Sequence, residues 1–172
     1  MIAEGWAALE RADWERARAI FEGAPESAES LDGLGLARWF GDEVDEGVAL
    51  RERAFEAYVA DGDCDRAARV ATWISRQYLI SGRASAANGW LARAERALTA
   101  VPECGGHGWV AVEHARGAPT AAEAAALAKR ALTIAREHGD ADLESFALSV
   151  LGRAQIANGH VDDGFARLDE AM

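Results

Sequence analysis

Hydrophobic residues in this chain follow the spacing of helices and not the alternation of strands. β-Branched residues never run in the alternating order that a strand requires, and alanine, leucine, arginine and glutamate, which are strong helix formers, are abundant. Pro25, Pro102 and Pro119 all fall at predicted connections, where a missing backbone N–H and a fixed φ do no harm. The chain is therefore predicted to be all-α.

Glycine-containing turns divide the helical sequence into segments. The phrases ADGDCD, SGRAS, EHGDAD and ANGHVD each place glycine where a helix must end in a left-handed conformation. Thr120 and Glu123, behind Pro119, have the spacing of a capping box. The predicted helices form five pairs and cover residues 3–11, 13–22, 27–40, 44–60, 64–81, 84–100, 107–116, 120–138, 141–158 and 161–172.

Successive helix pairs resemble one another, and the spacing is clearest near the carboxyl end. There it is similar to the tetratricopeptide frame W-x2-L-G-x2-Y, a turn, and A-x3-F-x2-A, through Leu148, Leu151, Gly152, Gln155, Gly159, Gly164, Leu168 and Ala171. Weaker copies lie around Ala17 and Phe21, around Gly35 and Gly47, around Ile74 to Ala94, and around Ala124 to Ala131. The repeats predict a tetratricopeptide-like α-solenoid of about five antiparallel helix pairs.

The small residues of this frame are predicted to mark the points where paired helices cross closely, while large residues fill the gaps between pairs. The resulting core depends on close helix contacts more than on bulky side chains. We expect residues 1–172 to form one repeat domain that is a fragment of a longer array. Phe165 and Leu168 would then have nothing beyond them, and this open end could pair with another copy in a homodimer.

Charge and composition limit the choice of partners. The net charge of −11 gives no counterion release on nucleic acid, so this region is not expected to bind DNA directly. Cys64 and Cys104 are too few for a disulfide framework and are expected to be reduced thiols. No leader sequence and no apolar run of about 20 residues is present, which predicts a cytoplasmic protein without membrane contact.

Three longer stretches resemble the amino-terminal repeat region of large bacterial, especially actinobacterial, LuxR-type transcriptional regulators. The distinctive phrases within them are LGLARWF, ANGWLARAERAL and GFARLDEAM. Such regulators end in a helix-turn-helix module with a signature similar to L-T-x-R-E-x-E-V, which no stretch here matches. The resemblance implies a sensory or scaffolding region without the DNA-reading part, or a homologue that never had one.

Two places carry side chains that could bind a metal ion. Asp61, Asp63 and Asp65 occupy the first three ligand positions of an EF-hand loop, but arginine replaces its glycine and threonine its final glutamate. An acidic helix start explains these residues better. Cys104, His107 and His114 have donor types that suit zinc but lack the tight pairs of zinc sites, so neither a metal nor another cofactor is expected.

No catalytic motif is recognisable. The chain has no glycine-flanked serine elbow, no phosphate loop with a lysine, and no histidine in a catalytic spacing. We therefore predict that the chain is not an enzyme. A deep pocket with a histidine and a carboxylate in contact would argue against this prediction.

Recognition by shape remains, because the first helices of a tetratricopeptide array line a concave groove. Arginine beside tryptophan suits a protein, a peptide or a small-molecule effector, and Arg69 with Arg76 is predicted to form an anion-recognising spot. Some of the six tryptophans must instead be spacers between alanine-rich helices. The predicted ligand or peptide groove contains Trp39, Arg69, Trp73, Arg76, Trp109, Glu113 and Arg153, with Leu36, Thr72 and Ile156 on or near it.

Two functions remain open. One is the protein-interaction or effector-sensing region of a LuxR-type regulator, and the other is a free-standing adaptor or oligomeric scaffold unrelated to transcription. A downstream helix-turn-helix in the full gene would distinguish them.

Overall fold

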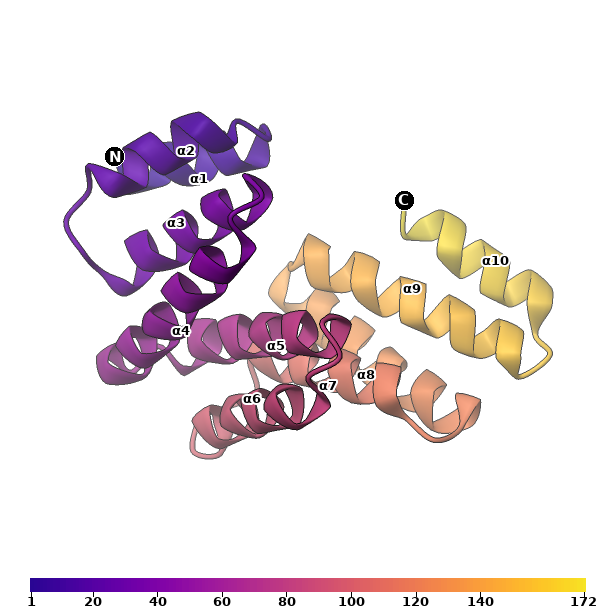
Figure 1. The fold of residues 1–172 in the computed structure, drawn as a ribbon. Helices are drawn as coiled ribbons and strands as arrows, with labels where there is room; N and C mark the ends of the chain where they lie inside the picture. Colours follow the sequence, from indigo (N-terminus) through magenta and orange to yellow (C-terminus); the bar gives the residue numbers. More distant parts are fainter. The chain divides into compact units, whose positions relative to one another are not determined.

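The computed structural model describes all 172 residues, and every regular element in it is an α-helix. All ten predicted helices are present, with ends within two residues of those expected. They are α1 (Ile2–Glu10), α2 (Trp14–Glu22), α3 (Ala28–Phe40), α4 (Val44–Asp61), α5 (Cys64–Ile80), α6 (Ala84–Leu98), α7 (Gly105–Gly117), α8 (Ala121–His138), α9 (Ala141–Ala157) and α10 (Val161–Glu170), as Figure 1 shows. None of them has the length and apolar character that crossing a bilayer requires.

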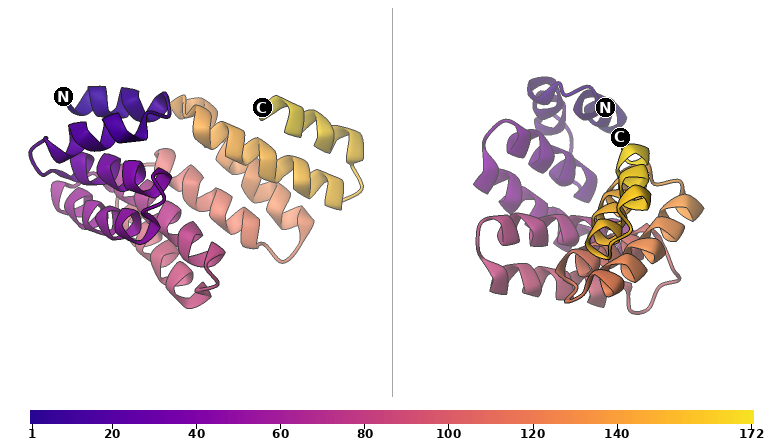
Figure 2. Two further views of the ribbon diagram at one scale, coloured as in Figure 1. Left: turned by 45° about the horizontal axis from the view of Figure 1, so that its top comes forward. Right: turned by 90° about the vertical axis from the view of Figure 1, so that its right-hand side faces the viewer.

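The chain divides into two compact units, Met1–Arg93 and Ala94–Met172, which we call unit 1 and unit 2. In unit 1, α1 packs on α2, α2 on α3, α3 on α4 and α4 on α5. In unit 2, α7 packs on α8, α8 on α9 and α9 on α10, and Figure 2 shows α9 and α10 side by side. Each helix therefore contacts mainly its neighbours in sequence, as in a repeat protein.

Six of the turns have the same construction. In each, one residue with a left-handed backbone conformation stands directly before the N-terminal cap residue of the next helix. Four of these residues are the glycines that the sequence predicts, Gly62, Gly82, Gly139 and Gly159, with φ between 65° and 86°. The other two are Ala12, with φ of 57°, and Asp42, with φ of 67°. The sequence pattern missed these two because neither residue is the one that this conformation favours.

Helix starts are capped by side chains of several types. The Thr120 hydroxyl accepts a hydrogen bond from the Glu123 backbone N–H at 3.2 Å, which is one half of the predicted capping box. The complete two-bond box occurs instead at Ser27 and Ser30, at the start of α3.

Small residues mark the closest helix crossings, as predicted. A Cβ on Gly47 would lie 2.7 Å from the Gly35 carbonyl oxygen, and a Cβ on Gly164 would lie 2.7 Å from the Gly152 carbonyl oxygen. Such distances leave no room for a side chain, so the backbones of α3 and α4, and of α9 and α10, touch. In both pairs the two glycines are twelve residues apart, from 35 to 47 and from 152 to 164.

The first and third helix pairs show how the same crossing tolerates other residues. In α5–α6 the Ser75 hydroxyl donates a hydrogen bond of 2.8 Å to the carbonyl oxygen of Ala87, again twelve residues further on. In α1–α2 the buried Phe21 ring fills the space that a Cβ on Gly5 or on Gly33 would need. Phe21 thereby spaces α1 from α3 and forms part of the core of unit 1.

The last helix leaves two large apolar side chains in solvent, Val161 and Phe165. Phe165 is 56% exposed, as expected for a residue with nothing beyond it. Leu168 is half-buried, because its Cγ lies 2.9 Å from the Cβ position of Gly152 and the side chain packs on α9. A leucine at this position covers part of its own helix pair.

Candidate interaction site

Four aromatic rings form a continuous row in unit 1. Trp14, at the start of α2, stacks on Phe40, at the end of α3, with ring centroids 4.2 Å apart. Phe40 meets Trp39 edge to face at 4.8 Å, and Trp39 meets Trp73 of α5 in the same way at 5.5 Å. The Trp39 indole N–H also donates a hydrogen bond of 3.2 Å to the amide oxygen of Gln77. Trp39 and Trp73, both predicted groove residues, are thus brought together.

A buried ion pair lies against this row. The guanidinium carbon of Arg51 is 4.2 Å from the centre of the Trp73 ring, a cation–π distance. Arg51 Nε is 2.7 Å from Asp32 Oδ1, and both residues are buried. Neither atom has another polar partner, so each depends on this contact. Burial lowers the pKa of Arg51, and the Asp32 carboxylate opposes that shift.

The two predicted arginines of the groove lie on the same helix as Trp73. Arg69, Trp73 and Arg76 follow one another at four and three residues, which places them on one face of α5. Arg69 is close enough to Arg51 for its like charge to contribute to the lowered pKa of Arg51. Thr72 is buried and its hydroxyl donates to the Arg69 carbonyl oxygen at 2.9 Å, so it supports α5 from within.

In unit 2 the predicted residue Trp109 belongs to a smaller cluster. Its indole N–H donates a hydrogen bond of 3.0 Å to the Asp140 carboxylate, the N-terminal cap of α9. Its ring meets Phe146 edge to face at 5.4 Å, and Phe146 is 37% exposed. Trp109 therefore joins α7 to α9 and also presents apolar surface.

The other predicted residues of unit 2 differ in exposure. Glu113, one turn after Trp109 on α7, is buried, and its carboxylate lies 3.9 Å from the Arg116 guanidinium. Arg153 is exposed and lies seven residues after Phe146, on the same face of α9. Ile156 is half-buried and packs against Gly164 of α10.

The six tryptophans fall into two groups. Trp6 meets the buried Phe21 edge to face at 5.7 Å, and the buried Trp90 meets Phe55 in the same way at 5.3 Å, so these two act as spacers. Four others, all half-buried, contribute to the aromatic row or the α7–α9 cluster, namely Trp14, Trp39, Trp73 and Trp109.

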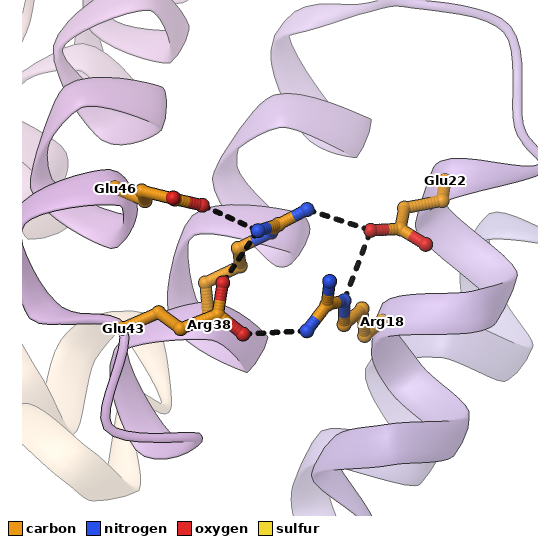
Figure 3. A network of polar contacts seen from close by, with 5 residues as sticks. All are labelled: Arg18, Glu22, Arg38, Glu43 and Glu46. Carbon is orange, nitrogen blue, oxygen red and sulfur yellow. Dashed lines mark hydrogen bonds and ion pairs between the residues drawn. The ribbon is translucent and has the colours of Figure 1, made fainter.

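A charged network links the first two helix pairs of unit 1 beside the aromatic row (Figure 3). Arg38 of α3 contacts Glu22 of α2 at 2.8 Å and also pairs with Glu43 and Glu46 at the start of α4. Arg18 of α2 reaches Glu22 at 3.0 Å and Glu43 at 2.5 Å. Hydrogen bonds from Arg18 and Arg38 lower the pKa of Glu22. At Glu43 burial is the largest single influence and raises the pKa, but the hydrogen bond from Arg38 and the positive charges of Arg18 and Arg38 together lower it.

A hollow of about 370 Å³ opens in unit 2 between the end of α6, α7 and α8. At its edge His114 Nε2 lies 2.6 Å from Glu95 Oε1, and the two side chains are 45% and 46% exposed. This is a histidine and a carboxylate in contact, the arrangement that would argue for an enzyme. Here, however, the pair stands in solvent and links α6 to α7, whereas catalytic pairs act in sites that exclude water.

The metal candidates have structural roles. His107 Nδ1 accepts a hydrogen bond of 3.2 Å from the Cys104 backbone N–H, which caps α7. Asp63 caps α5 by accepting from the Arg66 backbone N–H at 3.0 Å, and Gly62 before it forms the left-handed turn. No group of three or more histidine, cysteine, aspartate or glutamate side chains is arranged to hold a metal ion.

Sequence reasoning missed several residues of these clusters. Asp32 and Arg51 look like surface charges in the sequence, and Phe40, Gln77 and Phe146 lie outside the repeat frame. One signal was available for Arg51: it stands four residues after Gly47, where the frame has a large apolar residue. A charge at a core position needs a partner, and that requirement could have led to Asp32.

The fold is shared with tetratricopeptide-repeat proteins of known structure. Over 99% of its length the chain is similar to 32% of a chain in the APC/C hetero-tetramer Cut9–Hcn1, with a TM-score of 0.74 and 14% identity. It is similar over 97% of its length to 75% of BtubC (BKLC) from P. vanneervenii, with a TM-score of 0.64 and 15% identity. It is also similar over 99% of its length to 90% of a Podosopora anserina protein with nearly identical TPR-like repeats, with a TM-score of 0.60 and 14% identity.

No protein-family model and no curated protein matches the sequence. At these identities the structural likeness establishes the fold, which is a tetratricopeptide-like α-solenoid. Folds of this kind present surfaces for protein interaction.

Proposed function

We propose that this chain is a protein-interaction module and that the surface around Trp39 and Trp73 binds a peptide segment of its partner. The observation that carries the proposal is the meeting of these two rings on α3 and α5, with Arg69 and Arg76 on the same face of α5. Flat aromatic area beside guanidinium groups is the composition typical of binding hot spots.

The charges at this surface favour a peptide that carries a carboxylate. Arg69 and Arg76 supply two guanidinium groups on the same face of α5 as Trp73. Other repeat arrays that clamp a terminal carboxylate use lysine and asparagine at set positions, and this chain has neither there. The proposed contact is therefore made by arginine, which can bind a carboxylate through two hydrogen bonds.

We propose no catalytic role for the chain. The histidine–carboxylate pair of unit 2 is half-exposed and its hollow is open, so it lacks the excluded water and fixed geometry of a catalytic site. A small-molecule effector at the surface remains the alternative ligand to a peptide.

For the biological setting we favour the sensing region of a LuxR-type regulator, on the strength of the sequence resemblance alone. In this reading residues 1–172 are part of a longer cytoplasmic array, and DNA is bound elsewhere in the protein. The competing proposal is a free-standing adaptor or scaffold that pairs with a second copy through its ends. Reading the complete gene for a helix-turn-helix module tests the first, and light scattering of the purified chain tests the pairing.

The peptide-binding proposal can be tested by selecting ligands from a phage-displayed peptide library on the whole chain and measuring their affinities by titration. The variant Arg69→Gln/Arg76→Gln should weaken carboxylate-bearing peptides about tenfold or more. The variant Arg53→Gln/Arg93→Gln is the matched control, because it removes two exposed charges from the same unit. Equal affinities for the two variants would refute the proposed site.

A further inference from the structure

Large apolar side chains are exposed along one edge of unit 1, next to the proposed groove. This edge is made by the α1–α2, α3–α4 and α5–α6 turns, which Figure 1 shows on the same side of the unit. Phe40 is 45% exposed, Val44 46% and Ile80 73%. Isolated apolar residues on a surface are ordinary, but a contiguous set marks an interaction site.

These residues hold equivalent places in successive helix pairs, so they form a row. Phe40 stands five residues after Gly35, and Ile80 stands five residues after Ser75, the equivalent crossing residue of the next pair. Trp14 and Val44 each stand three residues before the small residue of a second helix, Ala17 and Gly47 respectively.

The row is also continuous in space. Trp14 stacks on Phe40, Phe40 touches Trp39, and the Trp39 indole donates a hydrogen bond to Gln77. Contacts therefore run from α2 through α3 to the last turn of α5, the turn that carries Ile80.

The edge that carries this row is acidic. Glu10, Glu15, Asp42 and Asp45 lie in or beside the first two turns, are exposed, and form no ion pair. The three turns hold two basic residues: Arg11, which is exposed, and Arg83, which lies over the Tyr78 ring at 4.5 Å. A second copy of the chain would bring carboxylates against carboxylates, which is unfavourable.

We propose that this edge is a second docking surface, for an amphipathic basic helix of a partner protein. Apolar residues of that helix would cover Phe40, Val44 and Ile80, while its lysines or arginines face the unpaired carboxylates. Neighbouring helices in a stack lie about 10 Å apart, and a partner helix advances about 10 Å in seven residues. The occupant is therefore a helix whose apolar residues recur at i and i+7, with basic residues between them.

The probe for this surface is an amidated helical peptide of about 15 residues built from leucine and lysine, with leucine at every third or fourth position. Its affinity for the whole chain is measured by fluorescence anisotropy, next to that of the same peptide with glutamate in place of lysine. The lysine peptide should bind at low salt and weaken as salt is added, and the glutamate peptide should not bind. Equal binding of both peptides would overturn the proposal.

Matched variants locate the binding on this edge. Ile80→Ser should weaken the lysine peptide about tenfold, whereas Val59→Ser, on the opposite end of α4 and 45% exposed, should leave it unchanged. Asp42→Asn/Asp45→Asn should weaken it about fivefold at low salt only, in contrast to Glu123→Gln/Glu137→Gln on α8. Circular dichroism checks that all variants fold.

Two results would contradict the assignment. If Ile80→Ser and Val59→Ser weaken the peptide equally, the peptide binds without regard to this edge. If sedimentation shows a dimer of the chain that Ile80→Ser alone dissociates, the occupant is a second copy and not a basic helix. Neither result would contradict the proposal that the groove binds a peptide, because that proposal is tested with the Arg69 and Arg76 variants.

Discussion

The second and fifth helix pairs cross in the same way but place opposite chemistry beside the crossing. Arg51 stands four residues after Gly47 in α4, and Leu168 stands four residues after Gly164 in α10. Arg51 Cγ lies 2.5 Å from the Cβ position of Gly35, and Leu168 Cγ lies 2.9 Å from that of Gly152. Both side chains cover the first glycine with an aliphatic stem, so the crossing requires only that stem.

Beyond the stem the two side chains differ in whether their buried ends need a partner. The leucine ends in methyl groups and buries apolar surface, which is favourable without a partner. The arginine ends in a charge that burial penalises, and it depends on Asp32 and on the Trp73 ring. The repeat frame thus determines the backbone contact, while unit 1 uses the same position to fix a cation beneath its candidate binding surface.

The largest expected effect comes from removing the partner of the buried charge. Asp32→Asn leaves Arg51 buried without a counter-ion and should lower the free energy of unfolding by about 3–5 kcal/mol. Urea denaturation followed by tryptophan fluorescence measures it. An Asp32→Asn chain as stable as the parent would show that the carboxylate is not needed.

The same comparison predicts that the apolar packing of α9–α10 can replace the ion pair of α3–α4. The position equivalent to Asp32, which stands three residues before Gly35, is Ser149, which stands three residues before Gly152. The double variant Asp32→Ser/Arg51→Leu should therefore match the parent in stability to within about 1–2 kcal/mol, because a buried ion pair replaced by apolar packing is often neutral. A double variant as unstable as Asp32→Asn would contradict this explanation.

A methyl group at the crossing should have the next largest effect. Gly47→Ala should cost about 1–3 kcal/mol because its Cβ would meet a backbone carbonyl oxygen, and Gly164→Ala should cost less because α10 packs mainly on α9 alone. Gly89→Ala, in a helix with open space around it, is the control and should stabilise by up to about 1 kcal/mol. Thermal unfolding of the three variants compares them, and a loss at Gly89 would contradict the steric account.

The turns offer a smaller contrast between the units. The left-handed residues of unit 2 are both glycine, whereas Ala12 and Asp42 of unit 1 adopt this conformation at a cost. Ala12→Gly should therefore stabilise the chain by about 0.5 kcal/mol, the relief of strain being partly offset by the entropy of the unfolded glycine. Gly62→Ala should do the opposite, and both are measured by the urea midpoint.

The smallest effect is the response of the charged network of unit 1 to acid. The pKa values of Glu22 and Glu43 are lowered in the folded chain by their arginine partners. Their contribution to stability is complete above the unfolded pKa near 4.5 and is lost as the pH falls through the folded pKa values. Urea midpoints between pH 6 and pH 3 should fall less steeply for Glu22→Gln than for the parent chain.

The helices and turns were predictable because they depend on local chemistry. Glycine and proline determine where helices end, and the spacing of small residues determined which helices cross. Ala12 and Asp42 show the limit of this reasoning, since their left-handed conformation comes from the packing of the helices that they join and not from their own preference.

The candidate site was predictable only in part. Tryptophan and arginine on the first helices pointed to Trp39, Trp73, Arg69 and Arg76, and the structure brings the two tryptophans together. That this groove binds a ligand stays a prediction, as does the membership of both units in a single domain. The carboxylate that balances Arg51 lies nineteen residues earlier in the chain, at position 32, and no local pattern connects the two.

The sequence by itself determined the helical fold, the position of each turn and the glycine crossings, because each of these follows from residues a few positions apart. Only the tertiary structure decided which charges are buried, which aromatic rings meet, and which apolar residues stay in solvent. Those outcomes depend on contacts between helices, and the free energy of a charge or a ring depends on what surrounds it, not on its place in the sequence.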